Sequence, residues 1–365
     1  IQMPSSLNKI YIGTMSGTSY DSIDVCAISV GRNIKLLNFL SFSYPPKLKK
    51  EIASVIEKQI LSLSDYGELN IKIGQAFGKA INAFIKKNNI DKANIAAIGL
   101  SGQTLWHKPS GKYPYSIQAG EPSIVAQQCE IKVVHDFRNE HIKLGGEGAP
   151  LVPEFHQRIF ASSKQTRLII NIGGIANYSY LRKEKAFFGA DSGPGNALLD
   201  IYCQKYLNRN FDRNGLIARK GTIHKPSLGK MLSHPFFKKK GSKSTGKEIF
   251  NLQFIPRSLL KDCPENILAT LTELTAISIA REIKTKESEL QEVILCGGGI
   301  KNTFLVNRIS AQTSLPLCSS ELFGYDPQAI EAMAFGWLAR QRVENYPLIV
   351  NKSKGVLGKI TKFKL

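Results

Sequence analysis

The chain has 365 residues, of which 42% are hydrophobic, and it carries a formal net charge of +20. Two domains of ordinary size fit this length, and the hydrophobic fraction argues against a disordered chain. A membrane-spanning segment and a disulfide or zinc framework are not expected, because no apolar run approaches ~18 residues and the six scattered cysteines form no CxxC pair.

The first part of the chain predicts three strands followed by alternating helices and strands. Apolar runs and their periodicity predict these elements in chain order: strands over 9–13, 23–30 and 34–44, helices over about 47–63 and 67–88, a strand over 95–102, a helix over about 121–129 and a strand over 132–137. The glycine- and proline-rich residues 144–153 then predict a hinge.

The second part repeats this plan. Its expected elements are strands over 167–174, 176–181 and 185–191, a helix beginning near Gly195, a helix over about 265–287, a strand over 292–299 and helices over 302–312 and 327–342. Two α/β domains of related topology are therefore expected. We assign residues 1–145 to the first domain, residues 146–350 to the second and residues 351–365 to a basic tail.

Four glycine-rich turns follow predicted strands: GTMSGTS at 13–19, SGQT at 101–104, NIGGIAN at 171–177 and CGGGIKN at 296–302. Glycine lets backbone N–H groups approach an anion closely, and ligands of α/β proteins gather at strand carboxyl ends. Simple hairpins are the alternative for any one turn. The GxxxxGK match at 241–247 is rejected as a P-loop because Glu248 replaces the required hydroxyl residue and no buried strand precedes it.

Two acidic residues are candidates for chemistry. Asp191, in GADSGPGN, ends a predicted strand just before a helix, where a carboxylate can act as a base. A helix-capping aspartate is the alternative, and the following Gly-Pro-Gly favours catalysis. Glu331 interrupts the apolar stretch of the last helix, where a charge is costly unless it is paired or faces a cleft.

Polar residues near the first domain's later strands suggest a ligand contact. Arg138, in HDFRNEH, has the fork geometry that binds carboxylates, although a surface pair with Asp136 is the alternative. His135 and His141 frame it on an expected loop at poor metal-binding spacing. Gln103 and Thr104 carry groups suited to sugar hydroxyls.

Taken together, these segments resemble the anhydro-N-acetylmuramic acid kinases of bacterial cell-wall recycling. The resemblance runs from IGTMSGTSYDSIDV through GQTLWH, DFR, GGEGAPLVP, NIGGIAN, DSGPGN, KSTGKEIFN and CGGGIKN to EAMAFGWLA, and so covers nearly the whole chain. It implies the sugar kinase, Hsp70 and actin fold, in which two duplicated actin-like, ribonuclease H-like α/β domains flank an ATP cleft. Ser22 and Ser192 depart from the usual Gly and Thr of the family motifs, and both changes leave the aspartates in place.

The resemblance also implies roles for individual residues. Asp191 would be the catalytic base, and Glu331 would assist the metal or the leaving oxygen. The sugar-facing residues would be Gln103, Thr104, Arg138 and Glu147. The residues expected at the nucleotide are Gly13, Thr14, Met15, Ser16, Gly17, Thr18, Ser19 and Tyr20 in the first loop, Gly173 and Gly174 in the second, and Gly297, Gly298 and Gly299 near the adenosine.

The implied reaction consumes ATP with Mg²⁺, phosphorylates O6 of 1,6-anhydro-N-acetylmuramic acid and opens its anhydro ring with water. The products are N-acetylmuramic acid 6-phosphate and ADP. A sugar kinase of the same fold that leaves the ring intact is the alternative. The family also suggests a homodimer.

The lysine-rich composition allows a third reading, a non-enzymatic nucleic-acid binder. The lysines are scattered, however, and no RNP, helix-turn-helix or zinc-finger pattern accompanies them. We therefore expect no nucleic-acid partner and no membrane partner. Because the N-terminus shows no apolar signal segment and the cysteines look reduced, we expect a cytoplasmic protein.

Overall fold

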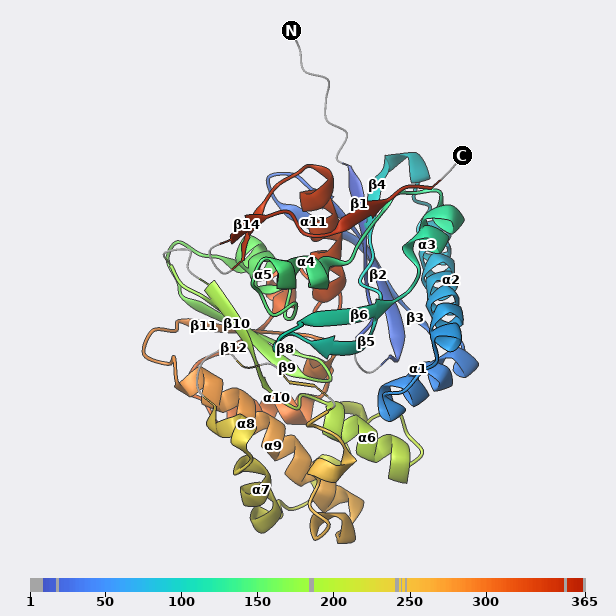
Figure 1. The fold of residues 1–365 in the computed structure, drawn as a ribbon. Helices are drawn as coiled ribbons and strands as arrows, with labels where there is room; N and C mark the ends of the chain where they lie inside the picture. The colour runs from blue at the N-terminus through green and yellow to red at the C-terminus, as the bar shows by residue number, and fades with distance from the viewer. Residues whose placement is uncertain are drawn as a thin grey trace. The chain divides into compact units, whose positions relative to one another are not determined.

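The structure is a computed structural model that describes residues 9–17, 20–183, 187–239, 243, 245–246, 248–350 and 353–363. The chain forms two compact units (Figure 1). Unit 1 contains residues 1–151 and 329–365, and unit 2 contains residues 152–328. None of the helices described is both long and apolar enough to cross a membrane.

Unit 1 is built on a six-stranded sheet in the order β15-β7-β4-β1-β2-β3. Its strands are β1 (Ile10–Met15), β2 (Ser22–Val30), β3 (Ile34–Ser43), β4 (Ile95–Gly99), β7 (Val133–His135) and β15 (Lys359–Thr361). Strand β2 pairs antiparallel with β1 and β3, whereas β4 runs parallel to β1 and β7 runs parallel to β4. Strand β15 closes the edge by antiparallel pairing with β7.

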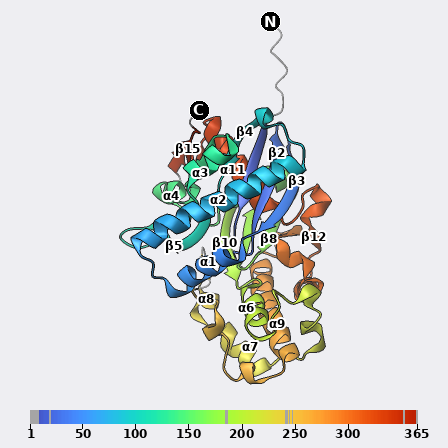
Figure 2. The same cartoon turned by 90° about the vertical axis from the view of Figure 1, so that its right-hand side faces the viewer.

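Helices cover both faces of this sheet. Helices α1 (Pro46–Lys58), α2 (Leu63–Lys87) and α3 (Pro122–Cys129) bury Ile52, Phe77 and Val125 against Ile12. Figure 2 shows α2 lying across the strands. Successive strand residues face opposite sides, so Gly13 faces the other layer, where α11 (Ile330–Val343) packs. A hairpin, β5 (Gln103–Lys108) and β6 (Tyr115–Ala119), and helix α4 (Phe137–Lys143) complete the part that holds the candidate residues.

Unit 2 has a five-stranded sheet in the order β10-β9-β8-β11-β12. Its strands are β8 (Arg167–Ile172), β9 (Ala176–Leu181), β10 (Phe187–Gly193), β11 (Glu292–Cys296) and β12 (Leu317–Ser319). Helices α9 (Pro264–Lys284) and α10 (Thr303–Ser310) pack Ile279 and Leu305 against it, and α5 (Pro153–Phe160) contacts β9 and β10. A second apolar cluster joins α9 to α6 (Ala197–Tyr206), α7 (Lys225–Leu232) and α8 (Pro235–Lys238).

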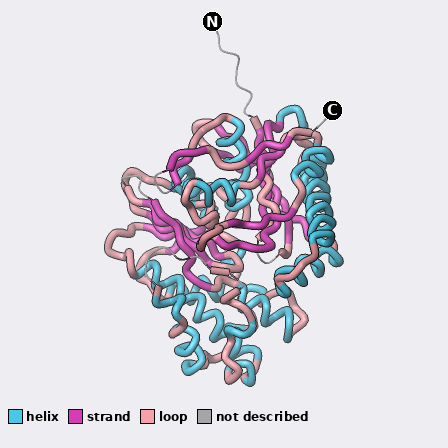
Figure 3. Tube along the Cα trace, in the orientation of Figure 1, coloured by secondary structure: helices cyan, strands magenta, loops and turns pink. Residues whose placement is uncertain are grey.

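The remaining elements are short connections (Figure 3). They are the hairpin β13 (Leu348–Val350) and β14 (Ser353–Gly355), and the 3₁₀ turns η1 (Lys92–Asn94), η2 (Arg213–Gly215), η3 (Ala218–Lys220), η4 (Leu252–Phe254), η5 (Leu259–Lys261), η6 (Gly298–Lys301) and η7 (Ser320–Phe323).

The two sheets share one plan. In each, the first strand is central, the second and third extend the sheet antiparallel on one side, and the next two extend it parallel on the other. This confirms the predicted pair of α/β domains with related topology.

Three expectations differ from the structure. Residues 137–143, expected as a loop, form α4, and residues 359–361 of the expected basic tail form β15. The unit boundaries also differ from the expected domains, because residues 329–350 belong to unit 1. Helix α11 joins unit 1 because Gly13 and Gly99 let its backbone come very close to β1 and β4.

Candidate functional site

The loop that follows β1 in unit 1 is fastened to Gln103. The Ser16 hydroxyl lies 2.6 Å from Gln103 Oε1, and Gln103 Nε2 donates to the Gly17 carbonyl at 3.3 Å. The Tyr44 hydroxyl donates to Ser16 Oγ at 3.1 Å. Gln103 is completely buried, so its amide, which was expected to face a sugar, is used to hold the first glycine-rich loop.

The other residues of this loop are held mainly by backbone contacts. The Thr14 hydroxyl donates to the Gly99 carbonyl at 3.1 Å, and Met15 is buried in β1. The Tyr20 N–H donates to the Gly17 carbonyl at 3.1 Å, with Tyr20 in the left-handed region at φ 46°. Thr18 and Ser19 lie outside the described residues.

Arg138 and Glu331, which were predicted from separate motifs, come into electrostatic reach of each other within unit 1. Arg138 lies on α4 and donates from Nη1 to the Gly148 carbonyl at 3.0 Å. Its buried Nε makes no hydrogen bond to any residue that the structure describes. Burial lowers the pKa of Arg138, and the Glu331 carboxylate, in the first turn of α11, acts in the opposite direction. A ligand carboxylate would find an unused guanidinium donor here.

Two histidines beside Arg138 are kept neutral. Burial and the positive charge of Arg138 lower the pKa of both His107 and His141 to about 4. His141 Nδ1 accepts a hydrogen bond from the Gly148 N–H at 2.9 Å, and the backbone carbonyl of Glu147 lies close to His107. At neutral pH these two rings add no charge, so Arg138 determines the positive potential of this cluster.

Thr104, in β5, bonds to the other strand of the β5–β6 hairpin. Its hydroxyl donates to Gln118 Oε1 at 2.8 Å, and Gln118 Nε2 donates to Ser116 Oγ at 2.8 Å. Asn139 of α4 accepts from the Ser116 N–H at 2.9 Å. This chain of bonds connects the β5–β6 hairpin to the helix that carries Arg138.

The glycine turns of unit 2 meet at the ends of the parallel neighbours β8 and β11. The Gly173 and Gly174 carbonyls accept from the N–H groups of Asn196 and Ala197, each at 2.9 Å. A Cβ on Gly299 would lie 2.3 Å from Ile172 Cγ2, so only glycine allows this approach. The structure therefore brings together Gly173, Gly174 and Gly297–Gly299, at the strand ends where α/β proteins bind ligands.

Asp191 lies in β10 of the same unit and is only 7% exposed. Its backbone N–H donates to the Lys243 carbonyl at 2.8 Å, and its Oδ2 accepts from the Thr245 N–H at 2.8 Å. Asp191 thus lies in the strand and does not cap the following helix. A buried carboxylate held by a backbone N–H is suited to act as a positioned base.

Lys243 and Thr245, whose backbones contact Asp191, are not among the predicted site residues. Lys243 is buried, and its Nζ lies 2.8 Å from Glu282 Oε1 on α9. The sequence analysis used this stretch only as a rejected P-loop and as one motif of the family resemblance, and neither indicated a contact with Asp191.

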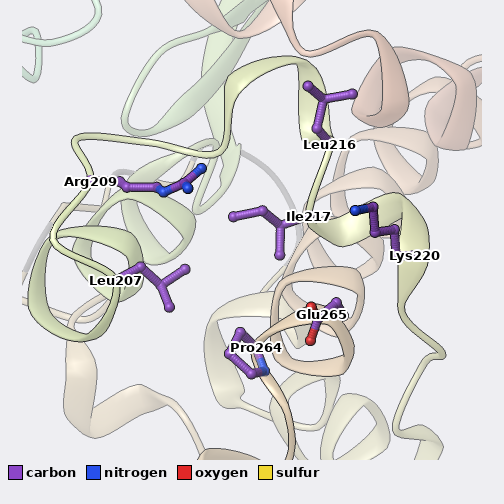
Figure 4. A pocket seen from close by; sticks show the side chains of 7 residues that line it. All are labelled: Leu207, Arg209, Leu216, Ile217, Lys220, Pro264 and Glu265. Atoms are coloured by element: carbon purple, nitrogen blue, oxygen red, sulfur yellow. The ribbon is translucent and has the colours of Figure 1, made fainter.

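Unit 2 also contains a pocket (Figure 4). Its volume is about 440 Å³, and it is lined by Leu207, Arg209, Leu216, Ile217, Lys220, Pro264 and Glu265. None of the predicted site residues lines it, so the pocket does not mark the candidate site.

The described residues contain no group of three or more His, Cys, Asp or Glu side chains placed to hold a metal ion. Protein-bound Mg²⁺ commonly uses only one or two carboxylates together with substrate phosphates, and Mg²⁺ stays a prediction for this chain.

The whole chain matches one protein family. The family model described as anhydro-N-acetylmuramic acid kinase matches residues 9–361. The chain belongs to the anhydro-N-acetylmuramic acid kinase family. A relative of that name from the gamma-proteobacterium EBAC31A08 is 46% identical over 361 residues, which cover 98% of this chain and 99% of the relative. One from Sulfurovum sp. (strain NBC37-1) is 41% identical, with 92% of each chain covered.

Solved structures resemble this family member more distantly. The activator of the 2-hydroxyisocaproyl-CoA dehydratase from Clostridium difficile with bound ADPNP has a TM-score of 0.48 and 11% identity, covering 92% of this chain and 96% of that one. A PilM–PilN type IV pilus biogenesis complex has a TM-score of 0.46 and 12% identity, covering 90% of this chain and 97% of that one.

Proposed function

We propose that this protein phosphorylates 1,6-anhydro-N-acetylmuramic acid with ATP and opens the anhydro ring with water. The products would be N-acetylmuramic acid 6-phosphate and ADP, as cell-wall recycling requires. The observation that carries the proposal is the family match over residues 9–361. The buried Asp191 and the Arg138 cluster supply groups of the kind that the two halves of this reaction need.

Asp191 is the proposed base for ring opening. It takes a proton from water as the water oxygen bonds to the anomeric carbon and the bond from that carbon to O6 breaks, as in an inverting glycosidase. The released O6 then attacks the γ-phosphoryl group of ATP, and the bond to the ADP oxygen breaks. Glu331 is proposed to assist at the leaving oxygen or the metal.

The glycine turns are proposed to hold the nucleotide. Gly173 and Gly174 would approach the phosphates and Gly297–Gly299 the adenosine, with backbone N–H groups meeting the negative charge. The first loop, Gly13–Tyr20, is proposed to serve the phosphates as well. Mg²⁺ bound with the nucleotide would neutralise charge on the phosphates.

The sugar-side residues lie in unit 1. Arg138 is proposed to bind the lactyl carboxylate of the sugar, because its buried Nε has no partner among the described residues and a bidentate carboxylate would supply one. Thr104 and Glu147 are proposed to contact sugar hydroxyls. Gln103, whose amide is engaged with the first loop, would act on the sugar through that loop.

The test is an ADP-release assay with ATP, Mg²⁺ and 1,6-anhydro-N-acetylmuramic acid, followed by mass analysis of the sugar. Wild type should form ADP and a ring-opened 6-phosphate. A phosphorylated sugar that retains its anhydro ring would indicate a kinase without ring opening, and ADP formation only with another sugar would replace the substrate. Because the proposed reaction consumes ATP, we propose that the protein acts in the cytoplasm, and the homodimer that the family suggests stays a prediction.

The same assay tests the base. Asp191→Asn keeps an oxygen that can accept from the Thr245 N–H, so the fold should persist. Turnover should fall by ~10²-fold or more, because an amide cannot take the proton, while ATP binding measured by calorimetry stays near wild type. Near-normal turnover in Asp191→Asn would reject the assignment.

A further inference from the structure

The segment that contacts Asp191 is anchored by a buried ion pair on its other side. Both backbone groups next to the carboxylate come from this segment: the Lys243 carbonyl accepts the Asp191 N–H, and the Thr245 N–H donates to Oδ2. The Lys243 side chain runs into unit 2, where only 6% of it is exposed. Its Nζ lies 2.8 Å from Glu282 Oε1 and 5.0 Å from the centre of the Phe236 ring.

Glu282 fixes this lysine from a rigid element. It lies near the end of α9, and its side chain is 13% exposed. Its other oxygen, Oε2, is 3.2 Å from Lys286 Nζ, and Tyr178 of β9 bonds to the same carboxylate. Ala190, next to Asp191, pairs with Tyr178 in the sheet. Glu282 of α9 therefore contacts both Lys243, whose carbonyl bonds to Asp191 in β10, and Tyr178 in the neighbouring strand β9.

Loss of the Lys243–Glu282 ion pair would be costly, and this cost connects the pair to the backbone around Asp191. A buried ammonium group that loses its carboxylate partner is strongly unfavourable. The chain can avoid that cost by moving the Lys243 side chain out of the interior. The bonds from the Asp191 N–H to the Lys243 carbonyl and from the Thr245 N–H to Asp191 Oδ2 would then be lost.

We infer that Lys243 and Glu282 are positioning residues that hold the backbone around Asp191 and so fix the direction of its carboxylate. The inference rests on the proposed function for the chemistry that Asp191 performs. That the Lys243–Glu282 ion pair orders the backbone next to Asp191 follows from the contacts alone.

The first measurement needs no turnover. Amide hydrogen exchange in the full chain would be compared between wild type, Lys243→Met and Lys286→Met. Lys286 is the matched control, because it pairs with the same carboxylate at 12% exposure, while its other contacts run to the Glu282 carbonyl, Thr285 and the rings of Tyr178 and Phe188. Exchange at Asp191 and Thr245 should become ~10-fold faster in Lys243→Met and stay near wild type in Lys286→Met. Equal exchange in all three proteins would overturn the inference.

The second measurement separates positioning from plain destabilisation. In Lys243→Met, kcat should fall ~10-fold, as a small misplacement of a reacting group allows, with both KM values within about twofold of wild type. Lys243→Arg, which can still reach Glu282, should recover most of the loss. A rise in KM with unchanged kcat, or a failure of Lys243→Arg to recover activity, would contradict the inference.

Two further comparisons keep the test decisive. If Lys243→Met does not fold, Glu282→Gln keeps an acceptor oxygen for Lys243 and should show the same changes at smaller size; a wild-type exchange pattern and kcat there would contradict the inference. If wild type itself does not turn over the anhydro sugar, the proposed function fails, and the exchange measurement still decides whether the ion pair orders the segment.

Discussion

At the scale of the residue, Arg138 is a charged group beside two neutral histidines. Burial lowers the pKa of Arg138, but an arginine guanidinium stays charged in proteins at neutral pH. The neighbouring His107 and His141 have pKa values of about 4 and are neutral there. An anionic group near Arg138 would therefore meet a partly buried positive charge, which water screens less than a surface charge.

We predict that Arg138→Ala raises KM for the anhydro sugar by ~10–100-fold, the loss expected for one charge-assisted hydrogen-bond pair. KM for ATP should change less than about twofold. Arg342→Ala is the control, because Arg342 also donates to a backbone carbonyl of unit 1, that of Gly358, at 2.8 Å. Steady-state kinetics with each substrate varied in turn would measure both effects. Equal increases for sugar and ATP would argue against a carboxylate contact.

Gly13 shows that a glycine in a ligand motif can also serve packing. A Cβ on Gly13 would lie 1.9 Å from the Ala332 carbonyl oxygen and 2.6 Å from the Gly336 nitrogen of α11. Gly298 differs, because its nearest atom would be Gln328 Nε2 at 3.4 Å. The first glycine is therefore required by the fold of unit 1, and the second is not required by its surroundings in unit 2.

We predict that Gly13→Ala lowers the free energy of unfolding by about 3 kcal/mol, because α11 must move away from β1. Gly298→Ala should keep stability within about 0.5 kcal/mol of wild type and raise KM for ATP. Urea unfolding and kinetics on the two variants would compare the effects. Wild-type stability in Gly13→Ala would show that the layer between β1 and α11 can adjust.

At the scale of the element, the last part of the chain returns to unit 1. Helix α11 packs on β1, β2 and β4, and β15 pairs with β7 through Lys359, Ile360 and Thr361. Lys359 Nζ also lies 2.7 Å from Asp136 Oδ2, directly before the helix that carries Arg138. The end of the chain thus supports the elements that position the proposed sugar-binding residues.

We predict that Leu357→Ala, at a position only 2% exposed, lowers the free energy of unfolding by ~2 kcal/mol or more. Ile349→Ala is the control, because Ile349 is 67% exposed in the neighbouring hairpin and should change stability by less than about 0.5 kcal/mol. Urea midpoints for the two variants would test whether the C-terminal segment is an integral part of unit 1. Equal midpoints would contradict this.

The sequence could predict the regular elements better than their partners. Apolar periodicity located β1, β2, α9 and β11, and glycine turns indicated where strands end, because these are properties of a few neighbouring residues. Periodicity does not say which sheet α11 covers, nor that residues 359–361 of the lysine-rich tail pair with β7. Likewise, the motif around Asp191 predicted an important carboxylate, but its contact with Lys243 joins residues 52 positions apart and depends on the folded chain.

At the scale of the whole molecule, buried histidines make stability depend on pH. His156 is fully buried, its Nδ1 lies 2.8 Å from Ser179 Oγ, and burial lowers its pKa to about 3. Together with His107 and His141, it stays neutral in the folded protein at pH values where an unfolded histidine, with a pKa of about 6.5, takes up a proton. Proton uptake by the unfolded state alone stabilises that state.

We therefore predict that the unfolding free energy is insensitive to these groups above about pH 7. It should fall from about pH 6.5 down to about pH 4 for His107 and His141 and to about pH 3 for His156. His156 alone should cost ~2 kcal/mol on going from about pH 7 to pH 5. Urea unfolding at the two pH values would measure the change.

The variant His156→Gln should be less stable than wild type at pH 7, because the buried contact to Ser179 is disturbed. It should lose less stability than wild type on acidification, since glutamine does not titrate. An equal fall in wild type and His156→Gln would mean that His156 is protonated in the folded protein at pH 5, and that the interior around it admits the charge.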